Sequence, residues 1–158
     1  MKPKIAALIS KYADQSGELI STIEGLTDSQ LDKSLERGKW SIRRQVNHLA
    51  DSEINMVVRM KRVISEDLPL LPAYDQDKWA DRLFYDGSSV DDSVAVFFTL
   101  RISMARVLRE LKDKDFERFG IHTNNGKMSL LDLLEDTVEH FANHTKTIEK
   151  IKRKFNIK

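Results

Sequence analysis

The chain has 158 residues, with 26 lysines and arginines against 25 aspartates and glutamates, so its formal net charge is +1. This length is typical of one domain with its own hydrophobic core, and we expect a single domain over residues 1–158. Because the chain contains no cysteine, it can form neither a disulfide nor a zinc site with sulfur ligands, and any metal must be held by nitrogen and oxygen.

Charge and hydropathy also argue against several classes of partner. A net charge near zero is unlike that of nucleic-acid binders, whose domains are usually strongly basic. No apolar run approaches the roughly 18 residues of a membrane span, and Lys11 and Asp14 interrupt the N-terminal segment before it could serve as a secretory signal. We therefore expect a cytoplasmic protein that acts on a small-molecule substrate, with no nucleic acid and no membrane among its partners.

Residues 4–24 predict the first long helix. Apolar side chains recur there every three or four positions, as on one face of an amphipathic helix. They are Ile5, Leu8, Ile9, Tyr12, Leu19, Ile20 and Ile23. Gly25 ends the pattern, and a short helical turn is expected over residues 28–33 with Thr27 as its N-cap.

The second long helix is predicted over residues 42–66, directly after Ser41, which is a good N-cap. Two prolines within the following residues 68–88 prevent its continuation. This segment is longer than an antiparallel helical hairpin needs, so we interpret it as a crossover with one helical turn over residues 75–80. Such a crossover lets the second and third helices run parallel.

The remaining two helices are predicted over residues 90–111, capped by Ser89, and over residues 130–154, capped by Ser129. The pair Asn125-Gly126 between them suits a tight turn, so that segment forms either a small hairpin or an irregular loop. Four amphipathic helices of this length predict an all-α four-helix bundle, with a long crossover between its second and third helices.

His140 and His144 are the first candidates for chemistry. They lie four residues apart on the predicted fourth helix, which places both imidazoles on one face with Cβ atoms about 6 Å apart, close enough for one divalent ion. Neighbours at helical spacing, such as Leu133 and Ile148, belong to the apolar stripe, so the rings border the core. The alternative is a pair of boundary histidines whose nitrogens bond backbone carbonyls.

A catalytic metal site usually has three protein ligands and an open position, so a third ligand should come from another helix. His48 is the candidate. It lies at the margin of the apolar stripe of the predicted second helix, on the side of Gln45 and Ser52. Helical arithmetic alone allows the alternative of a half-exposed histidine without a metal.

Other residues could border such a site. His122 lies in a predicted loop, and we expect it to be exposed and not a ligand, although it could line the mouth of a pocket. Tyr74 and Trp79 of the crossover either cover the site or anchor the loop on the core. Candidates for a polar rim are Asp51, Asn55 and Arg59.

Four segments together carry a family resemblance. They are KWSIRRQVNHLADS (residues 39–52), PAYDQDKWA (72–80), GKMSL (126–130) and HFANH (140–144). In this order they resemble the DinB-like superfamily of four-helix proteins, and most closely its YfiT-like branch. The resemblance implies that His48, His140 and His144 bind one divalent ion, most often zinc or nickel.

The resemblance also implies an enzyme. Proteins similar to this chain include bacillithiol-type S-transferases, and more distant relatives include mycothiol-dependent isomerases. We therefore expect transfer of a low-molecular-weight thiol to a small electrophile, with metal-dependent hydrolysis and a non-catalytic metal-bound binding module as alternatives. Family members are often dimers, so a homodimer is a further expectation. Asn143 and Arg101 replace histidines that many YfiT-like proteins carry, which bears on substrate chemistry and leaves the three ligands intact.

Glu53 and Arg101 each fall near the centre of an apolar stripe, on the predicted second and third helices. An isolated buried charge is costly, so we infer that the two side chains pair. The pair either fixes the register of the two helices or makes Glu53 a partner of a metal ligand or a general base.

Overall fold

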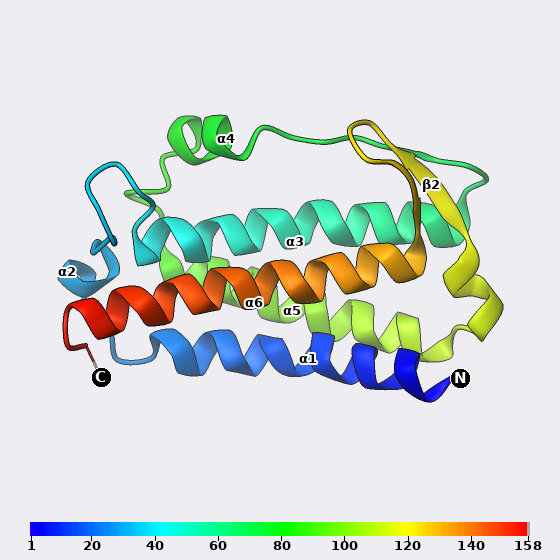
Figure 1. Ribbon diagram of the computed structural model, residues 1–158, viewed down its shortest axis with the longest axis horizontal. Coiled ribbons are helices and arrows are strands. Elements are labelled where there is room, and N and C mark those ends of the chain that lie inside the picture. Colours follow the sequence, from blue (N-terminus) through cyan, green and yellow to red (C-terminus); the bar gives the residue numbers. More distant parts are fainter. Residues whose placement is uncertain (158) are drawn as a thin grey trace.

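The computed structural model describes residues 1–157, and residue 158 of the expected domain lies outside the described residues. Four long helices form the bundle in Figure 1: α1 (Pro3–Ile23), α3 (Ile42–Ser65), α5 (Val90–Glu110) and α6 (Leu130–Lys154). α3 and α5 run in one direction, and α1 and α6 run in the opposite direction, so the predicted parallel arrangement of the second and third long helices is confirmed. α1 and α3 each pack against both α5 and α6.

Three of the four long helices begin at their predicted starts because a serine caps each of them. The side chains of Ser41, Ser89 and Ser129 each accept a hydrogen bond from the backbone N–H three residues later. The predicted turn after the first helix is α2 (Asp28–Leu31), which Thr27 caps.

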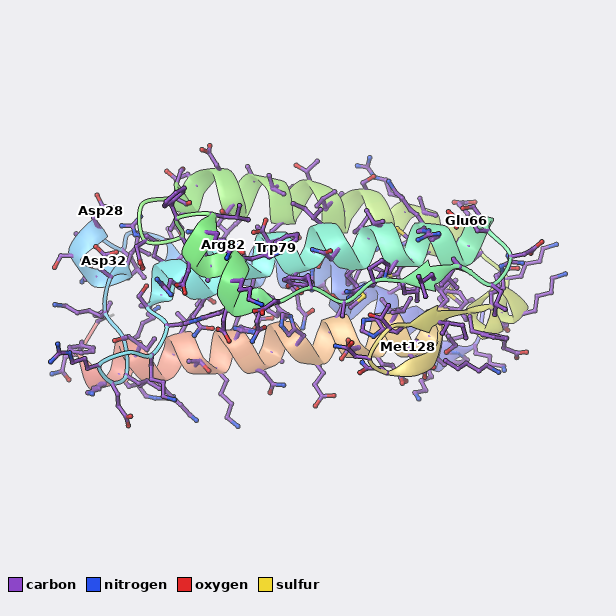
Figure 2. The ribbon with its side chains drawn as sticks, turned by 90° about the horizontal axis from the view of Figure 1, so that it is seen from above. Asp28, Asp32, Glu66, Trp79, Arg82 and Met128 are labelled. Carbon is purple, nitrogen blue, oxygen red and sulfur yellow. The ribbon has the colours of Figure 1, made fainter. Side chains whose placement is uncertain are left out.

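The crossover follows α3 and runs back along the bundle, over the face that α3 and α6 share (Figure 2). It contains β1 (Leu70–Leu71) and then α4 (Gln76–Arg82), whose N-cap Asp75 accepts a hydrogen bond from the backbone N–H of Lys78. The expected helical turn is therefore present, and it begins one residue later and ends two residues later than predicted.

A small sheet makes the expectation of an all-α fold only approximate. After the 3₁₀ turn η1 (Asp113–Glu117), β2 (Phe119–His122) and β3 (Gly126–Ser129) form an antiparallel hairpin. The crossover strand β1 pairs with β2 in parallel, which completes a three-stranded sheet. A two-residue strand has no alternating pattern of its own, so only its tertiary pairing reveals it.

Gly120 allows this pairing. A Cβ atom at this position would lie 2.7 Å from the backbone oxygen of Pro69, closer than a side chain tolerates. The glycine therefore lets the crossover lie against the hairpin.

Two groups of apolar side chains fill the bundle. One lies toward the sheet and includes Met60, Leu71, Met104 and Phe116. The other lies toward α2 and includes Leu19, Leu49, Phe97 and Phe141. Among the helices within residues 1–157, none combines the length and apolarity that a membrane span requires.

Candidate metal centre

Three histidine side chains from two helices meet where α3 packs against α6. His48 lies in the second turn of α3, and His140 and His144 lie one turn apart on α6. The Nε2 atom of His140 is 3.0 Å from the Nε2 atom of His48 and 3.0 Å from that of His144. One ligand atom from each of the three rings lies within 4.8 Å of the other two. The structure thus brings together all three predicted ligands.

His48 is buried, with 1% of its surface exposed, so the alternative of a half-exposed histidine is wrong. Trp40, which directly precedes the cap of α3, covers the rings. Its indole lies 5.0 Å from the His48 ring in an edge contact and 6.4 Å from the His144 ring in a stacked one. Helical periodicity describes only the residues of one helix, so it could not predict that Trp40, which lies outside α3, buries the ring of His48.

The environment of the rings keeps their imidazoles neutral. Burial, together with the neighbouring His144 and His140, lowers the pKa of His48 to about 2. Burial and His140 lower the pKa of His144 to about 4, and burial is also the main cause of the lowered pKa of His140. At neutral pH each ring therefore has one nitrogen lone pair to offer.

Gln45 selects which nitrogen of His144 carries the proton. Its Oε1 atom contacts Nδ1 of His144, and an amide oxygen can only accept, so the proton is on Nδ1 and the lone pair on Nε2. This is the arrangement by which an outer partner orients a metal-binding imidazole. The Nδ1 atom of His48, in contrast, is buried without a hydrogen-bond partner within residues 1–157.

The three rings fit a divalent metal ion. Imidazole nitrogens bind zinc at about 2.0–2.1 Å, so two ligands of one ion are at most roughly 4 Å apart, and His140 Nε2 meets this limit with both neighbours. Three converging neutral imidazoles cannot all satisfy one another, because each offers a single N–H. Among the described residues the group consists of these three histidines, the number of protein ligands that is common in catalytic zinc sites.

A pocket of about 260 Å³ opens beside His48 and His140. Its other polar lining residues are Ser52, Arg59, Tyr74, Gln76, His122, Asn124, Asn125 and Asp136. These come from α3, the crossover, the β2–β3 hairpin and α6. The pocket therefore depends on the crossover and the hairpin, which lie together over the face between α3 and α6 (Figure 2).

His122 lines this pocket, but the expectation that it is exposed is wrong, because only 7% of its surface is accessible. The tight turn between β2 and β3 folds over the ring. Its Nδ1 atom accepts hydrogen bonds from the backbone N–H groups of Asn124 and Asn125, at 3.3 and 3.2 Å. The sequence left two conformations possible for this loop, a hairpin and an irregular loop, so these contacts could not be predicted.

The other predicted border residues divide into two sets. Tyr74 and Arg59 line the pocket, while Trp79 packs against the Tyr74 ring at 4.6 Å between centroids. Asp51 and Asn55 are absent from the lining formed by the described chain, and the Asn55 amide instead donates to the backbone oxygen of Asp51.

Glu53 and Arg101 pair as predicted, with 2.9 Å between Arg101 Nε and Glu53 Oε2, and both are 1% exposed. Tyr12 donates from its hydroxyl to the other oxygen of Glu53. Arg101 also donates to the side chain of Gln15 and to the backbone oxygens of Tyr12 and Thr137. Glu53 does not line the described pocket, which favours the role of fixing the helix register.

Sequence reasoning missed Asp136. It lies one turn before His140 on α6, is exposed, and lines the pocket. Its carboxylate raises the pKa of His140, in opposition to the larger effect of burial. The spacing of four residues from a predicted ligand was the signal that could have identified it.

Comparison with known proteins agrees with this geometry. The sequence profile of the DinB superfamily matches residues 12–148, a range that includes all three histidines. The chain belongs to the DinB superfamily. A relative from Oceanobacillus iheyensis is 32% identical over 77% of this chain and 70% of its own length, and carries the name "Putative metal-dependent hydrolase". A Bacillus licheniformis relative with the same name is 33% identical over 80% of this chain and 72% of its own.

Two solved structures are similar to the whole fold. YfiT from Bacillus subtilis, described as a probable metal-dependent hydrolase with an unusual four-helix bundle topology, matches with a TM-score of 0.94 and 28% identity. That match covers 100% of this chain and 91% of YfiT. A mycothiol-dependent maleylpyruvate isomerase shares the fold at a TM-score of 0.69 and 12% identity, over 92% of this chain and 59% of the isomerase. The chain thus has a three-histidine site within a superfamily of metal-dependent proteins.

Proposed function

We propose that this protein is a metal-dependent S-transferase, which joins a low-molecular-weight thiol to a small electrophile at a divalent ion held by His48, His140 and His144. The observation that carries the proposal is the convergence of three neutral imidazoles at the edge of a pocket. Because the chain has no cysteine, it offers no thiolate of its own, and a sulfur nucleophile must be a bound small molecule. Zinc and nickel are the ions that we propose, since both accept imidazole ligands.

A divalent ion at this site would supply Lewis acidity, which lowers the pKa of a thiol or of water toward neutrality. The protein's own residues do the remaining work. Gln45 fixes the orientation of His144, and Trp40 excludes water from one side of the rings. Asp136 lies beside His140 in the pocket, where its carboxylate can accept the thiol proton.

The chemical step balances without a further reactant. The thiol sulfur forms a bond to an electrophilic carbon, and the leaving group departs with the electron pair of the bond that breaks. The thiol proton goes to Asp136 and from there to solvent. The leaving group, such as a halide, carries away the negative charge.

Two features support transfer between two molecules. A second pocket of about 400 Å³ is bordered by Trp40 and Gln45, which both contact His144, so this pocket borders the cluster at His144 while the first borders it at His48 and His140. The isomerase with the related fold is named as mycothiol-dependent, which favours a thiol as one of the two reactants.

Hydrolysis of a small substrate is the second candidate function. The names of the relatives favour it, and Asp136 could accept a proton from water as readily as from a thiol. In this case the second pocket would have no reactant to hold.

The test is turnover by the zinc-loaded protein. A chlorodinitrobenzene is offered with and without bacillithiol, glutathione or cysteine, beside a panel of esters and amides. His48→Ala is compared with Glu139→Ala, an exposed position of α6 outside the pocket. Thiol-dependent conjugation that His48→Ala abolishes and Glu139→Ala retains supports transfer. Thiol-independent cleavage with the same dependence establishes hydrolysis instead, and no turnover of either kind leaves a metal-bound binding module.

A further inference from the structure

The wall of the pocket beside the three histidines holds an arginine that pairs with no carboxylate of the described residues. Arg59 is half-buried, and its Nε and one terminal nitrogen both donate to the backbone oxygen of Pro72. It forms no ion pair within residues 1–157, and its other terminal nitrogen has no protein acceptor there. Since a guanidinium has five N–H donors and stays charged, Arg59 brings unused donors and a positive charge to the pocket.

His122 contributes a second donor of defined orientation. Its Nδ1 atom accepts two backbone N–H groups of the β2–β3 turn, so the proton of the neutral ring is on Nε2. The residue is 7% exposed and lines the pocket, and its Nε2 atom makes no hydrogen bond to the described residues and is not sealed from solvent. His122 therefore offers one fixed N–H to whatever occupies the pocket.

The fold holds these two donors side by side. Pro72, whose oxygen binds Arg59, directly follows Leu71, and Leu71 is the parallel partner of His122 in the sheet. One short stretch of the crossover thus binds the Arg59 side chain through Pro72 and pairs, through Leu71, with the strand that carries His122. Burial and the charge of Arg59 lower the pKa of His122, which agrees with this proximity and keeps the ring neutral.

We infer that Arg59 and His122 form a carboxylate subsite, which binds the carboxylate of a small substrate or cosubstrate next to the metal centre. A carboxylate has two oxygens, one for the guanidinium and one for the Nε2–H of His122, and hydrogen bonds between charged groups are the stronger ones. That the bound carboxylate belongs to a reactant depends on the proposed function. That the subsite binds a carboxylate depends only on the positions of Arg59 and His122.

Asp136 provides an opposing charge. It lines the same pocket without forming an ion pair with Arg59, and it is the acidic residue of that lining within residues 1–157. Its carboxylate repels a bound anion, so its replacement by a neutral isostere should strengthen anion binding. This is an effect that a purely structural role of Arg59 would not produce.

The experiment is a titration of the full-length, ¹⁵N-labelled chain with succinate, in zinc-loaded and metal-free form. Calorimetry gives the affinity, and the Nε2–H resonance of His122 reports the location. Succinamide, which has the same carbon skeleton without charge, is the control ligand. We expect saturable binding of succinate that shifts the His122 resonance, and no such response to succinamide.

Four variants sharpen the test. Arg59→Gln should weaken succinate binding by at least about tenfold. His122→Asn retains an oxygen that can accept the turn N–H groups and loses the donor to the pocket, so we expect a weakening of several-fold. Asp136→Asn should strengthen binding, and Arg59→Lys, which keeps the charge without the planar fork, should give an intermediate affinity.

Equal binding of succinate and succinamide would overturn the inference, and so would unchanged affinity in Arg59→Gln and His122→Asn. If Arg59→Gln fails to fold, Asp136→Asn replaces it in the test, and succinate binding by Asp136→Asn that is no tighter than that of the unchanged protein would overturn the inference. Succinate binding in a protein without any turnover would contradict the proposed function and support the subsite. Turnover in a protein that does not bind succinate would support the proposed function and contradict the subsite.

Discussion

The bundle contains two polar clusters of opposite character. Around Glu53 and Arg101, the further hydrogen-bond partners come from α1 and α6, so the buried network joins all four long helices. At the three histidines, the Nε2 atoms face one another and Nδ1 of His48 has no partner within residues 1–157. A closed network contributes to stability and specificity of packing, whereas a set of converging lone pairs beside a pocket is suited to bind something.

The largest expected effect is the loss of metal from the histidine cluster. His48→Ala, His140→Ala or His144→Ala should each weaken metal binding by more than about 100-fold, since loss of an outer partner alone costs about 10 to 100-fold. Elemental analysis after dialysis and competition with a chromophoric chelator measure this. Glu53→Ala and the surface variant Glu139→Ala should keep one equivalent of metal. Equal retention of metal in all five variants would show that the three histidines do not bind the ion.

The next effect concerns stability. Glu53→Ala leaves Arg101 buried without its partner, so we expect it to lower the free energy of unfolding by about 3 kcal/mol or more. Joint replacement of both residues by leucine should cost much less, because no isolated charge remains. Denaturant midpoints of the single variants and of the double alanine variant give the coupling. Strictly additive losses would show that the two side chains do not interact in solution.

Gln45 offers a smaller perturbation of the histidine cluster. Gln45→Ala removes the acceptor that holds His144 by Nδ1 and should weaken metal binding about 10 to 100-fold, with little change in the fold. Gln45→Glu retains an acceptor and makes the imidazole more basic, so its affinity should equal or exceed that of the unchanged protein. An alanine variant with full affinity would mean that the outer contact does not orient the ligand.

The smallest expected effect is a pH dependence at the closed network. Burial and the Glu53 carboxylate raise the pKa of Tyr12 above its ordinary value of about 10. The folded chain therefore keeps a proton that the unfolded chain releases, and stability that is fully present below pH 10 is lost as the pH rises further, by at most about 1.4 kcal/mol per pH unit. Tyr12→Phe should be less stable at pH 7, and its deficit should narrow between pH 10 and 11. A constant deficit in urea unfolding across this range would contradict the raised pKa.

Local signals predicted most of the fold. Serine caps and apolar periodicity placed the long helices, because both act within a few residues of the chain. The β2–β3 hairpin was one of two alternatives for its segment, but the third strand escaped prediction, since β1 has only two residues and is a strand solely because β2 lies beside it. Gly120, which permits that contact, is not distinguishable in the sequence from a glycine of an ordinary turn.

The candidate site divides in the same way. Spacing on one helix brought His140 and His144 to one face, the need for a ligand from another helix pointed to His48, and the resemblance then implied all three. Trp40 buries His48, and the β2–β3 turn buries His122. Both contacts come from chain segments outside the long helices, so helical periodicity could not predict them. Arg59 was recognisable only as a polar residue of the rim.

The sequence separation of the three histidines has a consequence for the newly made chain. His48 and His140 are 92 positions apart, and the last helix supplies two of the three ligands. During synthesis, at about 5 to 20 residues per second, a nascent chain carries a single ligand of the site until α6 emerges. A prematurely terminated product that lacks α6 would expose one isolated imidazole and could not retain an ion, so tight metal retention distinguishes full-length molecules from incomplete ones.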